Sequence, residues 1–583
     1  MPVSTDPQAE FSAGILRSAR FGDIYFSTDG GLAETRTVFL AGCGLPDAWR
    51  NRRHFSVAEL GFGSGLNMLA TLALWRDTRP ADGYLQLFSV EGFPLAAADI
   101  KRALATFPEL ADLAQPLLRH WPDGARGLHR IAWPELHATL DLAIMEAEPA
   151  LAAWDGRADA WFLDGFAPAR NPAMWSEPVL AAVAAHTAPG GRLATYTVAG
   201  DVRRGLAAHG FAVERLPGFG RKRQRLEARF PGSMEERPVP VVAIIGAGVS
   251  GAALALAFRR LGVEARVYAS GSMASGNPAA LLSPRIDAGG GAPAMLYAQA
   301  FRHAVDLVRE TAPRALLAEG AIRLEVTERD AARFATAAAS PLFDRDALQP
   351  LDAADVAFRC SESASPPGLW MPEALTIAPA ELRRAWLLRE PVDRRIDAVE
   401  ARAGGGWKLF SGGAMAGEAD ILVVAAGAGT TELTGLPLRQ IRGQASFADV
   451  PFSGTPATWG HYCIPTATGL LFGATHDRDD SDAGLRDTDH ERNLAELAVM
   501  RPSLAEQLRT VPLSGSAGVR VAPRDTRPVA GHLGDGCYVL TGLGGRGFAL
   551  APLLAAHVAA MALGCPSPLP RDLALLVDPW RLL

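Results

Sequence analysis

The sequence predicts an α/β protein with two doubly wound units, the second of which is interrupted by an antiparallel sheet. Residues 56–69, SVAELGFGSGLNML, and residues 239–262, VPVVAIIGAGVSGAALALAFRRLG, each run from an apolar strand through a glycine-rich turn into a helix. Short apolar runs then alternate with helical patterns, which is typical of parallel sheets. A chain of 583 residues also exceeds one core and suggests roughly three or four folding units.

The composition is that of an ordinary soluble protein, with 49% apolar residues and a net charge of -6. Its five cysteines are widely spaced and form no metal-binding pair, so we expect reduced thiols, a cytoplasmic location and no metal site. The N-terminal residues do not resemble a secretory signal. No apolar run reaches the roughly 20 residues of a membrane span. Residues 551–564 come closest and are expected to form a packed helix.

The boundary between the two units is expected near Pro238. Residues 227–241, EARFPGSMEERPVPV, combine proline, glycine and charge without periodicity, as an exposed linker does. We therefore expect one domain at residues 1–238 and another at residues 239–583. The strand pattern of residues 419–429 returns late to the second sheet, which predicts an inserted substrate domain at about residues 310–520.

The first glycine turn predicts a nucleotide site. Gly61, Gly63 and Gly65 allow a sharp bend where a side chain would collide with a ligand. The next strand, residues 85–93, reaches Glu91, where a carboxylate at the carboxyl edge of the sheet can accept the hydrogen bonds of a ribose diol. The alternatives are that the glycines form an ordinary tight turn and that Glu91 is a solvated charge at the end of the strand.

A third strand, in residues 159–175, delivers Asp164 to the same edge of the sheet. Strand ends of this kind line the ligand crevice, so the acid would face whatever lies beyond the nucleotide. If the acceptor is an amine that attacks a methyl group, a carboxylate beside it attracts the cation and takes its proton.

The motifs FGDIYFSTDGGLAETRTVFL, ELGFGSGLN, DAWFLDGFAPARNPAMW and GFGRKRQRL resemble the methyltransferase half of the bifunctional tRNA 5-methylaminomethyl-2-thiouridine biosynthesis protein family, over about residues 21–226. The resemblance implies a Rossmann-like methyltransferase domain, S-adenosylmethionine on the three glycines and Glu91, and Asp164 near the acceptor amine. Family members tend to carry Gly-Asp where this chain has Met145 and Glu146, so Glu146 is expected to substitute at the adenine.

A basic cluster, RKRQR at residues 221–225, precedes the linker. It can neutralise several phosphates of a tRNA, and a solvated basic run is the alternative. The resemblance favours the phosphate role for Arg221, Lys222 and Arg223.

The second turn meets the pattern G-x-G-x-x-G with Gly246, Gly248 and Gly251, directly after a strand and at the start of a helix. This context predicts a dinucleotide site, in which the second glycine admits the pyrophosphate and the third lets helix and strand pack closely. The acid that usually holds the ribose is missing, because Ala269 and Ser270 stand at that position. Either Ser270 substitutes for the acid or the ribose is held from elsewhere.

Two further loops favour a flavin over a nicotinamide cofactor. A small-residue loop follows the second strand, and a late glycine turn opens a helix whose N-terminus suits a reduced, negatively charged ring. The residues expected at the cofactor are Ser275, Gly276, Asn277, Gly544, Gly545, Arg546 and Gly547.

The motifs SGNPAALLSPRID, GVRVAPRDTRPVAG and GLGGRGFALAPL resemble amino-acid-oxidase-like flavoproteins and the oxidase half of the same bifunctional family, from about residue 241 onward. The resemblance implies FAD and removal of the carboxymethyl group from 5-carboxymethylaminomethyl(-2-thio)uridine at the tRNA wobble position. The carboxylate on the leaving fragment calls for an arginine. Arg520, Arg524 and Arg546 lie in the matching motifs and are the candidates, and a structural ion pair is the alternative for each. His461, Tyr462 and His476 are expected near the base or in structural roles.

The sequence thus predicts a bifunctional tRNA-modifying enzyme with an N-terminal methyltransferase domain and a C-terminal FAD-binding domain that carries an inserted antiparallel-sheet substrate domain. The resemblance implies that oxidation to 5-aminomethyl(-2-thio)uridine precedes N-methylation to the 5-methylaminomethyl form. The alternative is a small-molecule amine or amino-acid oxidase fused to a methyltransferase-like tRNA-binding module. We expect tRNA as partner, and neither a membrane nor a protein partner.

Overall fold

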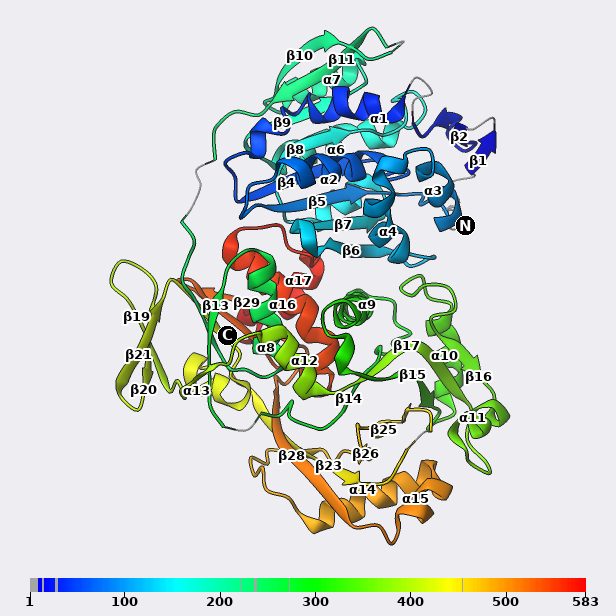
Figure 1. The fold of residues 1–583 in the computed structure, drawn as a ribbon, viewed down its shortest axis with the longest axis vertical. Coiled ribbons are helices and arrows are strands. Elements are labelled where there is room, and N and C mark those ends of the chain that lie inside the picture. The colour runs from blue at the N-terminus through cyan, green and yellow to red at the C-terminus, as the bar shows by residue number, and fades with distance from the viewer. Residues whose placement is uncertain are drawn as a thin grey trace. The chain divides into compact units, whose positions relative to one another are not determined.

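The computed structural model describes residues 9–12, 15–26, 30–220, 222–234, 238–271, 273–452 and 454–583. Figure 1 traces the chain and labels its elements. The contacts between Cα atoms divide it into two compact units, with the main division between Pro238 and Val239. The N-terminal unit also contains Arg260–Gly262 and Cys565–Arg571, and the C-terminal unit contains the rest.

The N-terminal unit is built on an eight-stranded sheet in the order β10-β11-β9-β8-β4-β5-β7-β6. Its strands are β4 (His54–Leu60), β5 (Tyr84–Val90), β6 (Gly127–Trp133), β7 (Ala138–Ile144), β8 (Ala158–Leu163), β9 (Thr187–Thr195), β10 (Ala212–Pro217) and β11 (Gln224–Arg229). Strands β9, β8, β4, β5 and β7 pair in parallel. The chain leaves β4 toward β5 on one side and later returns to β8 on the other, so the carboxyl ends of β4 and β8 form the crevice where such sheets bind ligands.

Apolar residues cover both faces of this sheet, as the alternation of strand side chains requires. Val57 and Phe162 belong to one buried cluster, whereas their neighbours Ala58 and Trp161 belong to another. The helices of this unit are α1 (Gly31–Glu34), α2 (Leu66–Thr78), α3 (Ala97–Leu104), α4 (Ala111–Arg119), α5 (Ala147–Ala153), α6 (Glu177–Ala185) and α7 (Gly200–Ala208). A small sheet of β1 (Ala9–Ser12), β2 (Ile15–Ser18) and β3 (Asp23–Ile24) precedes them.

The C-terminal unit contains a six-stranded sheet in the order β18-β13-β12-β22-β30-β29. Its strands are β12 (Val242–Ile245), β13 (Ala265–Ala269), β18 (Val392–Asp393), β22 (Ile421–Val424), β29 (Val529–Gly534) and β30 (Cys537–Thr541). Strand β22 pairs in parallel with β12, which confirms the predicted late return of residues 419–429 to this sheet. The principal helices are α8 (Val249–Arg260), α9 (Ala292–Thr311) and α16 (Gly547–Leu563).

A ten-stranded, mostly antiparallel sheet forms the second layer of the C-terminal unit. Its strands are β14 (Ala280–Leu282), β15 (Leu316–Leu324), β16 (Gln349–Leu351), β17 (Gly368–Ile377), β23 (Arg439–Ala448), β24 (Ala457–Thr458), β25 (Tyr462–Pro465), β26 (Leu470–Gly473), β27 (Asp477–Arg478) and β28 (Leu513–Ala522). Strands β18 and β22 of the nucleotide sheet lie between β17 and β23 in the chain. The sheet is therefore drawn from two segments, which differs from the single insertion expected at about residues 310–520.

The remaining elements flank these two sheets. Strands β19 (Ala398–Ala401), β20 (Trp407–Ser411) and β21 (Ala414–Ala419) form a separate three-stranded sheet. The remaining helices are α10 (Arg329–Ala338), α11 (Ala353–Cys360), α12 (Pro379–Leu387), α13 (Thr430–Thr434), α14 (Asp487–Met500), α15 (Pro502–Leu508) and α17 (Arg571–Val577).

The apolar helix near the C-terminus is longer than the sequence pattern suggested. With the turn that precedes α16, residues Gly544–Leu563 form 20 helical residues that are long and apolar enough to cross a membrane. The expectation that no segment reaches this length was therefore wrong. However, 61% of its 18-residue window is buried inside the protein, as in the core helix of a soluble protein.

Candidate active sites

The first glycine turn brings the ends of β4 and β8 together. Gly61 has a φ of 95°, in the left-handed region, and a Cβ atom there would lie 2.6 Å from the carbonyl oxygen of Asp164. Only glycine allows this approach without strain. The turn and the predicted base therefore lie side by side, and both line a pocket of about 610 Å³.

Glu91 closes the turn from the end of β5. Its Oε2 accepts a hydrogen bond of 2.9 Å from the N–H of Gly63, and its Oε1 accepts one of 2.8 Å from the N–H of Phe93. Burial raises the pKa of this carboxyl group, while the two N–H donors oppose the rise. Each oxygen keeps a second acceptor direction, which leaves the carboxylate able to bind a ribose diol. Gly65 caps α2 in the left-handed conformation.

Asp164 lies in the same pocket, held by a side chain of α2. Asn67 donates through Nδ2 to Asp164 Oδ2 at 2.7 Å and to Oε1 of the fully buried Glu59 at 2.9 Å. Burial raises the pKa of Asp164 to about 7, although Asn67 and the charge of Lys222 oppose the rise. A carboxylate with such a pKa can accept a proton near neutral pH.

Lys222 lines this pocket, and 44% of its side chain is exposed. Its Nζ is 2.9 Å from Glu34 Oε1 and 3.8 Å from the centre of the Tyr196 ring. Arg223 is exposed and does not line the pocket, and Arg221 lies outside the described residues. Among the described residues of the basic cluster, Lys222 is the one that lines the pocket together with Asp164.

Aromatic residues form one wall of the pocket, and sequence reasoning assigned them no role. Phe21 packs against Phe93 and Phe166, with ring centres 5.4 and 4.9 Å apart. Phe93 and Phe166 each follow a strand-end acid by two residues, in the sequences EGF and DGF, and this repeated pattern was the available signal. Glu146 is exposed and also lines the pocket. A planar base can stack on such a wall.

The second glycine turn opens a cavity of about 1730 Å³ in the C-terminal unit. Gly246 and Gly248 line it. Gly251 does not, because it faces β12, where a Cβ atom would collide with the carbonyl oxygen of Gly246. The third glycine therefore allows α8 to pack closely on the strand, and the N-terminus of α8 opens toward the cavity.

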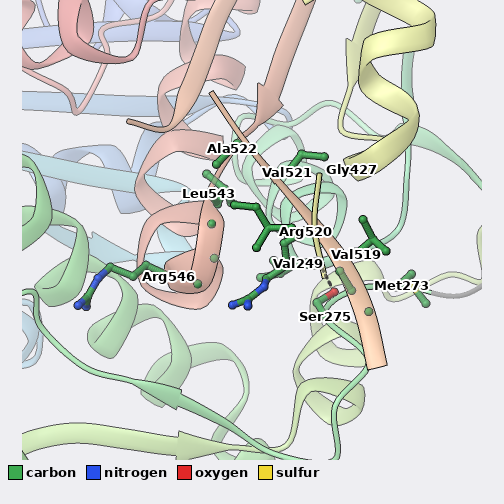
Figure 2. Close-up of a pocket in the computed structure, with 18 of the residues that line it drawn as sticks. Val249, Met273, Ser275, Gly427, Val519, Arg520, Val521, Ala522, Leu543 and Arg546 are labelled. Carbon is green, nitrogen blue, oxygen red and sulfur yellow. Dashed lines mark hydrogen bonds between the residues drawn. The ribbon is translucent and has the colours of Figure 1, made fainter. Parts of the chain in front are cut away.

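The small-residue loop lies beside this turn. Ser275 Oγ accepts a hydrogen bond of 3.2 Å from the N–H of Val249, the first residue of α8 (Figure 2). Asn277 lines the cavity, whereas Gly276 does not and instead donates its N–H to the carbonyl oxygen of Met273 at 3.0 Å. Ala269 and Ser270, at the position of the missing acid, both line the cavity.

The late glycine turn returns to the same cavity. Gly544, Gly545, Arg546 and Gly547 all line it. Gly544 has a φ of 56°, and no atom lies within 4 Å of the position of a Cβ atom there. Burial lowers the pKa of Arg546 to about 10. The turn thus presents open backbone and a cationic side chain to the cavity (Figure 2).

The candidate substrate residues lie on β28 and the turn after it. Arg520 is half-buried, and burial lowers its pKa. In the described part of the chain no hydrogen bond or ion pair holds its guanidinium group, which faces the cavity (Figure 2). Arg524 is exposed at the same cavity. His461, Tyr462 and His476 line it as well.

Both sites have the donors that their expected ligands require. The N-terminal pocket of about 610 Å³ falls within the range of roughly 300–1,000 Å³ typical of ligand sites. The second cavity is larger, as a dinucleotide together with a substrate demands. Among the residues that the structure describes, no group of three or more His, Cys, Asp or Glu side chains is arranged to hold a metal ion.

Family models match both units. Residues 108–231 match a family described as S-adenosyl-L-methionine-dependent methyltransferase, and residues 242–561 match a family described as FAD dependent oxidoreductase. Among solved structures, glycine oxidase from Geobacillus kaustophilus covers 56% of this chain and 95% of its own, with 22% sequence identity and a TM-score of 0.47. The two family models give S-adenosylmethionine as the cofactor of the N-terminal unit and FAD as that of the C-terminal unit.

Full-length relatives share both units. The tRNA 5-methylaminomethyl-2-thiouridine biosynthesis bifunctional protein MnmC from Caulobacter sp. is 52% identical over 97% of this chain and 96% of its own length. Its counterpart from Caulobacter vibrioides is 52% identical over 100% and 98%, and that from Maricaulis maris is 42% identical over 94% and 91%. The chain belongs to the family of tRNA 5-methylaminomethyl-2-thiouridine biosynthesis bifunctional proteins.

Proposed function

We propose that this enzyme modifies the wobble uridine of tRNA in two consecutive steps. The C-terminal unit converts 5-carboxymethylaminomethyl(-2-thio)uridine into 5-aminomethyl(-2-thio)uridine, and the N-terminal unit methylates the amine. The observation that carries the proposal is the presence, in one chain, of two different cavities. One is a dinucleotide cavity with an arginine, Arg520, that no described residue pairs, and the other is a nucleotide pocket with a carboxylate base. The family relatives of similar length carry a name for this biosynthesis.

In the oxidase unit, the chain binds and orients the substrate amine. When bound, FAD supplies a hydride acceptor and S-adenosylmethionine an electrophilic methyl group. Gly246, Gly248 and the N-terminus of α8 would hold the pyrophosphate, and Arg546 would offset negative charge near the late turn. Arg520 binds the carboxylate of the carboxymethyl group and thereby positions the adjacent carbon. The amine would lose a proton and that carbon a hydride, for which bound FAD is the acceptor. Addition of water to the resulting imine would then break the C–N bond and release glyoxylate from the aminomethyl group.

In the methyltransferase unit, Asp164 binds the acceptor amine and accepts its proton. Glu91 would hold the ribose of the methyl donor, and Glu146 is the proposed contact to its adenine. The Gly61–Gly65 turn would leave room for the ligand, because the N–H groups of Gly61, Gly63 and Gly65 already donate within the protein. Asp164 attracts the aminomethyl group as a cation and accepts the proton that the amine must lose when it forms the new N–C bond. The wall of Phe21, Phe93 and Phe166 offers a stacking surface to the uracil.

Anaerobic flavin spectroscopy tests the oxidase assignment. Addition of tRNA that carries 5-carboxymethylaminomethyl-2-thiouridine should bleach the flavin, whereas glycine or sarcosine at the same concentration should leave it oxidised. Bleaching by the small amines with no response to tRNA would instead support the alternative of a small-molecule amine oxidase. Calorimetry with S-adenosylmethionine tests the other unit, and absence of binding heat would exclude the methyltransferase activity.

A further inference from the structure

The cavity of the C-terminal unit is strongly cationic. Eleven arginines and only two glutamates, Glu432 and Glu496, are among its lining residues, although the chain as a whole carries a net charge of -6. FAD accounts for part of this charge through its pyrophosphate. The remaining arginines create a local field that attracts a further polyanion.

The register of three strands places part of this charge on one surface. Ile441 of β23 lies opposite Arg478 of β27 and, on its other side, opposite Arg520 of β28. Directly opposed residues of antiparallel strands point to the same face, and so do residues two apart in one strand. Arg439, Arg478 and Arg520 therefore share one face, here called the arginine face, and all three line the cavity.

Gly443 lies on the same face, and its lack of a side chain leaves space for the guanidinium group of Arg520. A Cβ atom at Gly443 would lie 2.7 Å from Nη2 of Arg520. The guanidinium group of Arg520 therefore lies across β23 at a point where that strand has no side chain. The charges of Arg478 and Arg520 also help burial to lower the pKa of His476, which shows that these cations act on the same small region.

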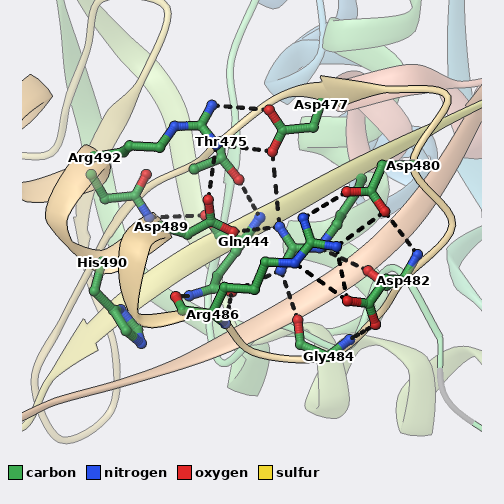
Figure 3. Close-up of polar contacts among 12 residues, drawn as sticks. Gln444, Thr475, Asp477, Asp480, Asp482, Gly484, Arg486, Asp489, His490 and Arg492 are labelled. Carbon is green, nitrogen blue, oxygen red and sulfur yellow. Dashed lines mark hydrogen bonds and ion pairs between the residues drawn. The ribbon is translucent and has the colours of Figure 1, made fainter.

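The opposite face of β23 carries a saturated ion network (Figure 3). Arg442 is fully buried, pairs with Asp489 and donates to the carbonyl oxygens of Asp482 and Gly484. Arg492 holds Asp477, the residue before Arg478, through two hydrogen bonds of 3.0 Å. The network fixes the backbone of β27 and so positions Arg478.

In the same network, the acids that follow β27 in the chain are ion-paired with an arginine outside the arginine face. Asp480 and Asp482 both pair with Arg486, at 2.7 and 2.8 Å. In the described residues no side-chain hydrogen bond or ion pair is formed by the guanidinium groups of Arg439, Arg478 or Arg520. Arg439 and Arg478 are exposed and Arg520 is half-buried. The face thus presents free cations from the interior of the cavity to its rim.

We propose that Arg439 and Arg478 form a subsite for the phosphodiester groups next to the modified uridine, while Arg520 receives the carboxylate deeper in the cavity. This inference rests on the proposed function, because it takes the substrate to be a nucleotide within an RNA strand. Beyond the carboxymethyl group, the anions nearest to the base in such a strand are its phosphates. Arginine suits them because its planar group donates two parallel hydrogen bonds.

The test compares R439A/R478A with the matched variant R384A/R509A. Arg384 and Arg509 are also exposed arginines of the C-terminal unit, each ion-paired on its own helix or helix end, and neither lines the cavity. Both variants lose two positive charges. Flavin reduction by substrate tRNA is followed anaerobically between 50 and 200 mM salt, and the flavin content and Tm of each protein establish that it is folded. If R439A/R478A does not fold, R439Q/R478Q takes its place.

Each single-strand phosphate contact adds about 0.7 to the slope with which log(kcat/KM) falls against log[salt]. Loss of two contacts should therefore make the fall in kcat/KM between 50 and 200 mM salt about sevenfold smaller. R439A/R478A should show this change with an unchanged rate at saturating tRNA, and R384A/R509A should behave as the wild type. The free nucleoside 5-carboxymethylaminomethyluridine, which has no phosphate, should react equally with all three proteins.

Two different failures are distinguishable. A salt dependence of R439A/R478A equal to that of R384A/R509A would overturn the phosphate subsite while the wild type still oxidises tRNA. An equal loss with tRNA and with the free nucleoside would also overturn it, because the two arginines would then act on the base or its side chain. If the wild type reduced no flavin with tRNA or nucleoside, the proposed function would fail and this inference with it.

Discussion

Replacement of Asn67 by alanine should move the pH dependence of methyl transfer. Asn67 donates to Asp164 Oδ2 at 2.7 Å, and this bond favours the ionised carboxylate. A hydrogen bond to a charged group contributes about 1.5–3 kcal/mol. Because one pKa unit corresponds to about 1.4 kcal/mol, the pKa of Asp164 should rise by roughly 1–2 units in Asn67→Ala.

The consequence for the rate follows from the fraction of Asp164 that is ionised. Burial raises the wild-type pKa to about 7, so half of the enzyme has a competent base at pH 7. In Asn67→Ala that fraction should be about 1–10% at pH 7, and the rate should fall about 5- to 50-fold there and recover above pH 9. The acid limb of the profile moves to higher pH, while the plateau changes little.

Single-turnover transfer from S-adenosylmethionine to tRNA bearing the aminomethyl group, measured from pH 5.5 to 9.5, checks this prediction. Thr35→Val is the matched control, because Thr35 donates to Asn67 Oδ1 at 2.7 Å and does not contact Asp164. The substrate amine titrates alike in all three enzymes. A rate loss that is uniform across pH, or an acid limb that stays at the wild-type position, would refute Asp164 as the titrating base.

Three further predictions concern buried groups. Burial raises the pKa of Glu59 well above 4.5, so the folded protein keeps a proton on this group that the unfolded chain releases. The folded state therefore loses stability as the pH rises above 4.5. Because Glu59→Gln removes this titration, its Tm should rise relative to that of the wild type between pH 5 and 8. Arg501 and Glu362 form a buried pair at 3.1 Å, and Arg501→Leu should lower the free energy of unfolding by about 3–5 kcal/mol in urea titrations, whereas an unchanged midpoint would contradict a structural role. Gly251→Ala should abolish the FAD content of the purified protein but keep S-adenosylmethionine binding in calorimetry, because the added Cβ atom separates α8 from β12.

The parts of the structure that could be predicted from the sequence are those set by local patterns. The glycine turns after β4 and β12 and the acids at the ends of β5 and β8 follow from short runs of adjacent residues. The order of parallel strands then places Asp164 beside Gly61. Such features need no knowledge of how distant segments pair.

The remaining parts depend on contacts between distant segments. Asn67 reaches Asp164 only because α2 turns one side chain toward both Glu59 and the end of β8. The arginine face requires the registers of β23 with β27 and β28, whose partners lie tens of residues apart in the chain. Likewise, the return of β22 to the nucleotide sheet could be predicted, but the pairing of β15 with β24, which joins two segments into one ten-stranded sheet, is a contact between distant residues that the chain pattern does not reveal.

The most direct test of the account is mass spectrometry of the wobble nucleoside after hypomodified tRNA is incubated with the purified enzyme. With FAD alone, 5-aminomethyl-2-thiouridine should accumulate at the expense of the carboxymethylaminomethyl form. Addition of S-adenosylmethionine should convert it to 5-methylaminomethyl-2-thiouridine, and Asp164→Asn should stop the reaction at the aminomethyl stage. A carboxymethylaminomethyl nucleoside that persists with both cofactors present would contradict the assignment of two consecutive steps to this chain.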